Sequence, residues 1–309
     1  AVIAGSAPQI LLEERLKAGK LILRYQERPL KNGLEPLKFL PRMVKWYRWN
    51  PPDKPVYLLC ASAYAARDYA KMGLFRRKAY KWGYFPAALP YDTEALLSQK
   101  EQGSLFWAGR FLDWKHPDDA LRVAARLRDD GYNFTLRIAG AGVLEPQLRA
   151  MVSELHLDGC VQLLGSLRPE QVRCEMERSR IFLLTSDRRE GWGAVLNEAM
   201  NSGCAVVASD AAGATPFLVK DGVNGSVYHS GDTQELYEKV RRLLDDTAAQ
   251  ERFGSAAYRT ISELWNAETA AERLLQLSQA LLDGRDAHKL FADGPCSPAH
   301  PLREDWYRK

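Results

Sequence analysis

Short apolar runs alternate with amphipathic stretches along most of the chain. In its second part, the apolar runs indicate buried strands at 105–108, 134–139, 161–164, 181–185, 205–209 and 226–228. Between and after them, helical spacing of apolar residues predicts helices at 118–129, 144–155, 169–178, 194–202, 215–219 and 232–244. Strands that alternate with helices are typical of a parallel sheet. The pattern therefore predicts a complete doubly wound α/β domain over residues 104–283.

The first part of the chain shows the same alternation with fewer strands. Strands are expected at 1–5, 20–25, 55–61 and 80–85, and helices at 9–17, 36–49 and 63–72, the second of them kinked near Pro41. This predicts a second, partial α/β domain over residues 1–85. The proline-bearing polar stretch 86–103 predicts a linker. A periodic helix is expected at 266–282, followed by a loose proline-rich tail at 284–309.

Composition is that of a soluble globular protein, with 46 % hydrophobic and 27 % charged residues among 309. There is no signal-peptide pattern and no apolar run of the roughly 20 residues that span a bilayer. The five cysteines show no CxxC and the five histidines no ligand spacing, so we expect neither a disulfide framework nor a metal site. These features predict a cytoplasmic protein.

Charge is distributed unevenly between the two parts. Residues 1–100 carry 18 Lys and Arg against 8 Asp and Glu, whereas the remainder carries 25 against 31. The expected helix at 36–49 is basic and rich in aromatic residues. Such a helix can lie on an anionic membrane, at the inner face in this case, or pack its aromatics on the sheet as a surface helix. Single-stranded nucleic acid lacks any supporting signature.

Two carboxylates, Glu190 and Glu198, flank the sequence Gly191-Trp192-Gly193, which opens the expected helix at 194–202. A helix start offers unpaired N–H groups and the positive end of the macrodipole, and glycines let an anion approach. Glu198, one turn into the helix, can accept hydrogen bonds from a vicinal diol. Anion, diol and further hydroxyls describe a nucleotide sugar. By itself the stretch favours the simpler interpretation, a glycine turn with a solvated Glu198 and with Glu190 placed favourably for the helix dipole.

The stretch is accompanied by further motifs in a fixed order. Arg110 and Lys115 follow the strand at 105–108, and glycines occur at 109, 140, 142, 165, 203, 222 and 225. This ordered set resembles retaining glycosyltransferases of the GT-B architecture, in particular family four, from about Leu105 to Leu282. The resemblance implies two Rossmann-like domains, the first of them incomplete here.

The resemblance also assigns site residues. It implies catalytic roles for Arg110, Lys115 and Glu190, with the two cations stabilising the departing diphosphate. It implies donor binding by Gly109, Gly165, Leu167, Gly191, Trp192, Gly193, Leu196 and Glu198. His116 departs from the family, which usually has glycine after this lysine. On the acceptor side, related enzymes often place a histidine where this chain has Gln26-Glu27-Arg28; Glu27 and Arg28 are either acceptor contacts or an Arg–carboxylate pair that shapes the cleft.

The function that these motifs imply is transfer of a sugar from a UDP-, GDP- or ADP-sugar, without a metal or other cofactor. The acceptor is expected to be a carbohydrate or a lipid-linked sugar, in surface polysaccharide or glycolipid assembly. Two alternatives remain at this point: a non-catalytic nucleotide-sugar-binding protein, and a dinucleotide-dependent oxidoreductase. Against the oxidoreductase, Gly140-Ala141-Gly142 has Glu145 where a dinucleotide fingerprint needs a third glycine.

Overall fold

A computed structural model describes residues 3–4, 10–33, 36–303 and 305–308. The chain divides into two compact units, one formed by residues 1–84 with 264–309 and the other by residues 85–263. Both units contain a parallel sheet with helices packed against it, which confirms the predicted α/β class.

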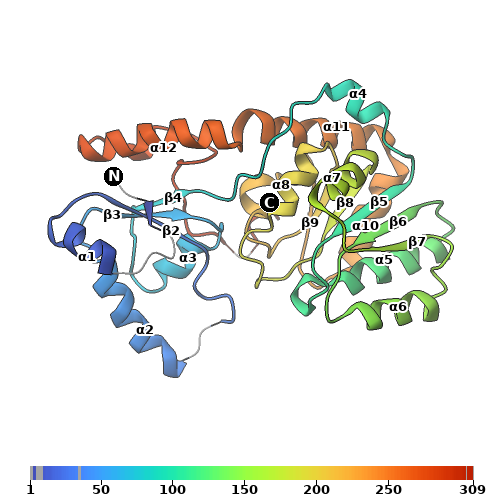
Figure 1. The fold of residues 1–309 in the computed structure, drawn as a ribbon, viewed down its shortest axis with the longest axis horizontal. Coiled ribbons are helices and arrows are strands. Elements are labelled where there is room, and N and C mark those ends of the chain that lie inside the picture. The colour runs from blue at the N-terminus through green and yellow to red at the C-terminus, as the bar shows by residue number, and fades with distance from the viewer. Residues whose placement is uncertain (1–2, 5–9, 34–35, 304, 309) are drawn as a thin grey trace. The chain divides into compact units, whose positions relative to one another are not determined.

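The second unit is built on a six-stranded parallel sheet in the order β10-β9-β8-β5-β6-β7 (Figure 1). Its strands are β5 (Ser104–Ala108), β6 (Thr135–Ala139), β7 (Val161–Gly165), β8 (Ile181–Leu184), β9 (Ala205–Ser209) and β10 (Ser226–Tyr228). All six lie within one residue of their predicted ends. The chain lays β6 and β7 on one side of β5 and then returns to place β8 on the other. Strands β5 and β8 are thus neighbours at the point where the strand order reverses.

Helices cover both faces of this sheet. Figure 1 shows α5 (Pro117–Asp129), α6 (Glu145–Glu154) and α10 (Thr233–Asp245) on one face, and α7 (Pro169–Arg178) and α8 (Ala194–Asn201) on the other. Side chains of β5 alternate accordingly, since Leu105 and Trp107 join the α5 side while Phe106 packs near Phe182 of β8. A sheet buried on both faces explains why its strands read as continuous apolar runs.

Three further helices complete the second unit: α4 (Thr93–Ser98), α9 (Thr215–Leu218) and α11 (Thr247–Arg259), the last leading into a π-helical turn at Thr260–Leu264. The sequence pattern did not predict α11, which contacts α8 and β9. Gly254 permits this packing, because a Cβ there would lie 2.4 Å from the carbonyl oxygen of Gly203. The stretch is rich in alanine and therefore lacks the strong apolar stripe by which the other helices are recognised.

Residues 86–103 differ from the expected linker, because they belong to the second unit. The backbone N–H of Leu89 donates to Asn201 Oδ1 at 2.9 Å, and that of Tyr91 donates to Tyr258 Oη at 2.9 Å. Leu96 of α4 is buried. Polar anchors and one apolar contact therefore hold this segment against α8 and α11.

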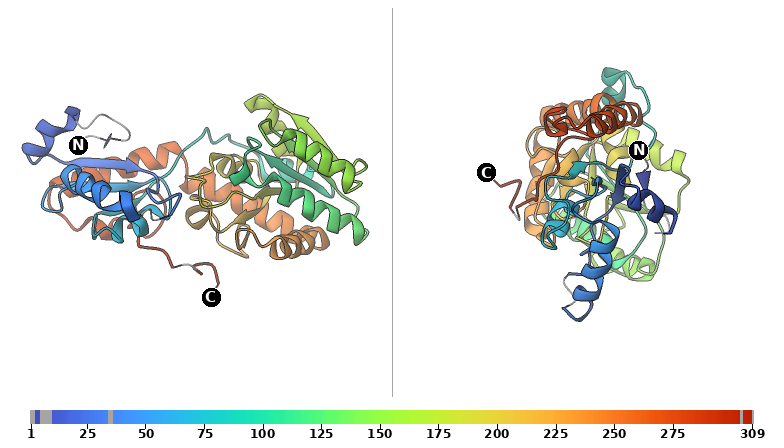
Figure 2. Two further views of the ribbon diagram at one scale, coloured as in Figure 1. Left: turned by 90° about the horizontal axis from the view of Figure 1, so that it is seen from below. Right: turned by 90° about the vertical axis from the view of Figure 1, so that its left-hand side faces the viewer.

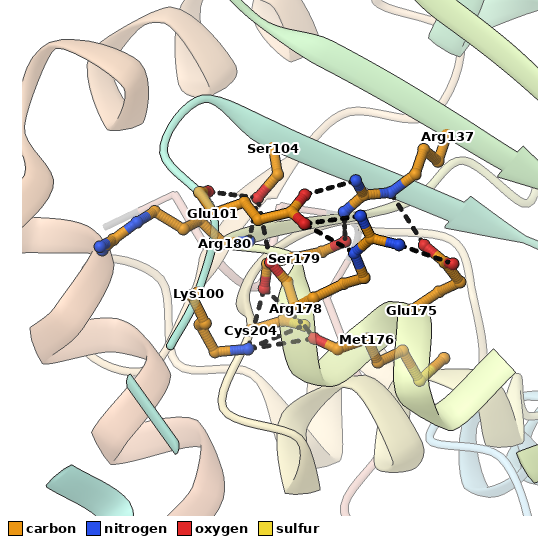
Figure 3. A network of polar contacts seen from close by, with 10 residues as sticks. All are labelled: Lys100, Glu101, Ser104, Arg137, Glu175, Met176, Arg178, Ser179, Arg180 and Cys204. Atoms are coloured by element: carbon orange, nitrogen blue, oxygen red, sulfur yellow. Dashed lines mark hydrogen bonds and ion pairs between the residues drawn. The ribbon is translucent and has the colours of Figure 1, made fainter. Parts of the chain in front are cut away.

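A buried polar network occupies the amino ends of the strands (Figure 3). The Lys100 ammonium donates to the carbonyl oxygens of Met176, Glu177, Ser179 and Ser202, at 2.7–3.1 Å. Beside it, the buried Arg137 side chain forms ion pairs with Glu101 and Glu175. Two of the four oxygens belong to the last turn of α7, where the helix dipole favours a cation. Burial lowers the pKa of Lys100.

The first unit contains a four-stranded parallel sheet, ordered β1-β2-β3-β4 among the residues described. The strands are β1 (Ile3–Ala4), β2 (Ile22–Gln26), β3 (Val56–Cys60) and β4 (Ala79–Lys81). Its helices are α1 (Ile10–Lys17), α2 (Pro36–Trp49), α3 (Ala65–Ala70) and α12 (Ala267–Leu282), with a 3₁₀ turn at Ala287–Lys289. Residues 1, 2 and 5 of the first predicted strand and residue 9 of the first predicted helix lie outside the described residues.

The segment after α12 is an integral part of the first unit, so the prediction of a loose tail was wrong for residues 287–299. It appears as the red trace beside the blue strands in Figures 1 and 2. Cys296 N donates to Lys81 O at 2.8 Å and Ala299 N donates to Ala79 O at 2.9 Å, which continues the sheet beyond β4. Ala287 and Cys296 are buried in a core shared with Leu277 of α12. The sequence pattern did not predict this pairing, because prolines lack the N–H of a sheet ladder and argue against a strand.

Candidate functional site

The loops that leave β5 and β8 bring two predicted site residues together. Lys115 follows β5 and Glu190 follows β8, and their side chains form an ion pair. Both side chains are largely buried, with 15 % and 14 % of their surface exposed. Ser186 Oγ also donates to the Glu190 carboxylate, at 3.4 Å. In open α/β sheets ligands bind at the carboxyl edge where the strand order reverses, and the pair lies at that point.

Backbone and side-chain hydrogen bonds tie the two loops to each other. Asp187 N donates to Trp114 O at 2.8 Å, and Thr185 Oγ1 donates to Lys115 O at 2.6 Å. The indole N–H of Trp107, within β5, donates to the same Thr185 oxygen at 2.8 Å. The positions of both loops are therefore fixed by the ends of the strands.

Arg189 adds a clamp that the sequence did not reveal. Its guanidinium forms ion pairs with Asp113 at 2.7 Å and Asp187 at 2.9 Å, and lies 5.5 Å from the centre of the Trp114 ring. Burial alone would raise the pKa of Asp187, but the hydrogen bonds and charge of Arg189 hold it below its ordinary value. The adjacent Arg188-Arg189 pair so close to the glutamate was the only sequence signal for this clamp.

The conformation of His116 accounts for the glycine that the family usually has at this position. Its backbone adopts the left-handed conformation, with φ 47° and ψ 52°, immediately before α5. Glycine favours this region, whereas a side chain there costs about 1 kcal/mol. The His116 ring lies 3.4 Å from Asp187 Oδ2, a contact that ties it to the Arg189 clamp.

The start of α8 lies directly beside Glu190. Gly193 is in the left-handed region, with φ 95° and ψ 60°, and precedes the first helical residue. A Cβ at Gly193 would lie 3.4 Å from Cγ of Glu190, so this side chain rests against the beginning of the helix. Gly213 N donates to Glu190 O and Ala214 N to Trp192 O, which fixes the loop backbone. The first turn of α8 thus offers N–H groups at the sheet edge.

Trp192 and Leu196, predicted as donor-binding residues, have side chains that are buried in the core. The Trp192 indole donates to Asn197 Oδ1 at 2.9 Å, and its ring lies 6.2 Å from that of Phe217. The structure therefore gives these two side chains a packing role beneath the loop. Gly191 is buried as well and contributes backbone only.

Glu198 carries a half-buried carboxylate on α8. Within the described residues, this carboxylate accepts no hydrogen bond; Arg173 instead donates to the Glu198 carbonyl oxygen at 3.3 Å. Burial raises the pKa of Glu198, and the charge of Arg173 opposes the rise. A half-buried carboxylate without a protein donor can accept hydrogen bonds from a ligand, so the group is suited to binding hydroxyls.

A depression of about 250 Å³ lies at the carboxyl ends of β5, β6 and β7. Predicted site residues Gly109, Arg110 and Leu167 line it, together with Gly140, Ala141 and Ser166. Gly140 must be glycine, because a Cβ there would lie 1.9 Å from Gly109 O. Gly165, at φ 68°, accepts the Gly140 N–H at the end of β7.

Arg110 differs from Lys115 in its surroundings. Its side chain is exposed and, within the part of the chain that the structure describes, makes no hydrogen bond or ion pair. The carboxyl edge therefore offers one available cation beside one that is already paired.

The predicted acceptor-side residues lie in the first unit, at a hollow of about 580 Å³ beyond the end of β2. Glu27 accepts from Tyr84 Oη at 2.9 Å and pairs with Lys31. Arg28 pairs through two nitrogens with Asp68, at 3.2 and 3.3 Å. Arg28 thus belongs to an Arg–carboxylate pair that shapes the hollow, while Glu27 is a lining residue.

Residues 3–4, 10–33, 36–303 and 305–308 contain no group of three or more His, Cys, Asp or Glu placed to hold a metal ion. Over the same ranges, no helix is long and apolar enough to cross a bilayer.

Together, a doubly wound parallel sheet, an ion pair at its switch point and a helix start beside that pair define an α/β protein with a charged site at the carboxyl ends of its strands. The family model of the glycosyl transferases group 1 matches residues 92–260, which is more than half of the chain. The chain belongs to this family.

Relatives with assigned names match the same region. The amylovoran biosynthesis glycosyltransferase AmsK of Erwinia amylovora is 30 % identical over 167 residues, covering 52 % of this chain and 41 % of AmsK. The exopolysaccharide phosphotransferase SCO2592 of Streptomyces coelicolor is 27 % identical over 191 residues, covering 62 % of this chain and 20 % of that protein. This chain therefore spans less than half the length of either relative.

The fold is also similar to that of solved glycosyltransferase structures. HepE of Anabaena, crystallised with UDP, superimposes with a TM-score of 0.70 at 17 % identity, over 90 % of this chain and 78 % of HepE. The predicted GT-B fold class is thereby confirmed, whereas the substrates of HepE remain properties of that protein.

Proposed function

We propose that the protein transfers a sugar from a nucleoside diphosphate sugar to an acceptor hydroxyl, with retention at the anomeric carbon. The observation that carries this proposal is the meeting of Lys115, Glu190 and the α8 start at the switch point, with Arg110 in the same loop as Lys115. Family membership and relatives named for exopolysaccharide assembly support it.

In this proposal the second unit binds the donor. The base enters the depression lined by Gly109 and Leu167, and the ribose hydroxyls donate to Glu198. Arg110, Lys115 and the N–H groups at 191–193 receive the diphosphate, while Glu190 accepts from sugar hydroxyls. Two cations and a helix start balance the charge of the leaving group without requiring a metal.

The transfer step breaks the bond between the anomeric carbon and the diphosphate oxygen. The acceptor oxygen forms the new bond on the same face, and its proton passes to the departing diphosphate. The protein accelerates the step electrostatically, by holding cations where negative charge develops. Glu190 acts as a positioning group for the sugar and forms no covalent intermediate.

The acceptor side is assigned to the hollow in the first unit. Tyr25, Trp46 and Tyr84 provide aromatic faces there, and Glu27 provides a carboxylate. Aromatic rings and hydrogen-bonding groups suit a carbohydrate, free or lipid-linked.

Helix α2 supports a peripheral position at the inner face of an anionic membrane. Leu40 and Val44, one turn apart, are 68 % and 71 % exposed, and Lys45 and Arg48 lie on the same outer side. We expect the wild type to sediment with phosphatidylglycerol vesicles and not with phosphatidylcholine vesicles. The double substitution Leu40→Glu with Val44→Glu should abolish the sedimentation with phosphatidylglycerol. The equally exposed Leu275→Glu on α12 is the matched control. Equal sedimentation of all variants would remove the membrane from the proposal.

The donor proposal is tested by calorimetric titration with UDP, GDP and ADP in EDTA. One nucleotide should bind, with affinity lost in Glu198→Ala and about tenfold weaker in Arg110→Ala. The matching nucleotide sugar is then assayed for transfer to carbohydrate acceptors. A folded protein that binds none of the three nucleotides would contradict the donor site, and binding without transfer to any acceptor would favour a binding protein.

A further inference from the structure

The Lys115–Glu190 ion pair has to separate before Lys115 can bind the diphosphate of a nucleotide sugar. Lys115 is already neutralised by Glu190, whereas Arg110, in the same loop, is exposed and has no partner among the described residues. An incoming diphosphate therefore meets one available cation and must take the other from a carboxylate.

The surrounding structure imposes this pairing. The carbonyl of Lys115 accepts from Thr185 Oγ1, and the backbone of Asp187 is bonded to Trp114. Arg189 bridges the two loops through Asp113 and Asp187. Because both backbones are fixed, Lys115 and Glu190 exchange partners by side-chain movement alone.

Separating a largely buried pair is costly unless each member receives a new partner. A nucleoside diphosphate supplies oxygens to Lys115 but leaves the Glu190 carboxylate with only the 3.4 Å hydrogen bond from Ser186 Oγ, next to additional negative charge. A nucleoside diphosphate sugar supplies the same oxygens together with hydroxyl donors for Glu190. Both Lys115 and Glu190 therefore gain new partners when the intact nucleotide sugar binds, whereas only Lys115 does when the nucleoside diphosphate product binds.

We propose that Glu190 competes with the diphosphate for Lys115, so that the site favours the intact nucleotide sugar over the nucleoside diphosphate product. After transfer, Lys115 returns to Glu190 and product release is accelerated. This inference rests on the proposed function and deepens it, since it assigns Glu190 a part in discriminating substrate from product.

The test is a double-mutant cycle on nucleoside diphosphate affinity, with UDP, GDP and ADP as probes. Glu190→Gln keeps the shape of the side chain and removes its charge, and should tighten binding of the recognised diphosphate roughly three- to tenfold. Its dissociation rate, measured by stopped flow, should fall by a similar factor. In a Lys115→Met background the same substitution should give a clearly smaller gain, because no cation is left to release and only the repulsion between Glu190 and the diphosphate is removed.

Two variants control the cycle. Glu154→Gln removes an exposed charge from α6 of the same unit and should leave the affinity unchanged, which excludes a general effect of net charge. Glu190→Ala provides a second variant, and thermal unfolding checks that each protein is folded.

The outcomes separate the inference from the function on which it rests. If wild type binds a diphosphate in a Glu198-dependent manner and Glu190→Gln binds it no tighter, the competition is overturned while the donor site stands. A gain of undiminished size in the Lys115→Met background also overturns it. If neither wild type nor Glu190→Gln binds any of the three probes, the donor site and the competition both fall.

Discussion

The amino and carboxyl edges of the six-stranded sheet differ in whether their charged side chains have protein partners. At the amino edge, Lys100 donates to four carbonyl oxygens. Figure 3 shows two of them, those of Met176 and Ser179, together with Arg137 between the Glu101 and Glu175 carboxylates. At the carboxyl edge, Arg110 is exposed, and the half-buried Glu198 carboxylate accepts no hydrogen bond from the residues described. The first arrangement is internally satisfied and stabilises the fold. The second leaves groups that have no protein partner among the described residues and are available to a ligand.

The largest effect is expected at the amino edge. Lys100→Met should destabilise the second unit by about 3–5 kcal/mol, because it leaves several buried carbonyl oxygens without a donor. Urea denaturation measures the loss. Lys220→Met, an exposed lysine of the same unit, should change the free energy of unfolding by less than about 0.5 kcal/mol. A loss below about 1 kcal/mol for Lys100→Met would show that the network is not a stability device.

The next effect tests the floor of the carboxyl edge. Gly140→Ala should destabilise the second unit by about 2–4 kcal/mol and weaken nucleotide binding, since the new Cβ would lie 1.9 Å from Gly109 O and push apart the loops after β5 and β6. Gly159→Ala is the matched control, because no atom lies within 4 Å of a Cβ there. The same urea and calorimetric measurements apply. Comparable stability of the two variants would mean that the loops move apart freely.

The smallest effect on stability, with a large effect on binding, is expected at Glu198. Its folded-state pKa is raised by burial, so the carboxyl favours folding when protonated and this contribution is lost as the pH rises through the raised pKa. Glu198→Gln should therefore raise the melting temperature by about 1–2 °C at pH 7 and not below about pH 4, where both states are protonated. Nucleotide affinity should fall at least about tenfold. Destabilisation at pH 7 would indicate that Glu198 belongs with the structural charges of the amino edge.

The sequence predicted all six strands of the second unit to within one residue. Buried strands such as Ile181–Leu184 and Ala205–Ser209 are continuous apolar runs, and turn residues limit them on both sides. Helix α11 was not predicted, because the faces of an alanine-rich helix differ little in hydrophobicity. The pairing of residues 296–299 with β4 was not predicted, because β4 lies more than 200 positions away in sequence.

The candidate site shows the same division. Glu190, Glu198, Arg110 and Lys115 were predicted as site residues from motif order. The roles of their neighbours were not, since Trp192 and Leu196 proved to be buried and the Arg189 clamp depends on the approach of two distant loops.

The sequence by itself determined the strands of the second unit, the family and the residues that carry charge, because these follow from local periodicity and from motif spacing. Only the tertiary structure decided which charges are paired. Strand order places β8 beside β5, and this adjacency brings Glu190 to Lys115 across 75 positions of sequence while Arg110 stays exposed. The strength of a charge depends on its distance to a partner and on the surrounding water, and both are fixed only when the sheet has formed.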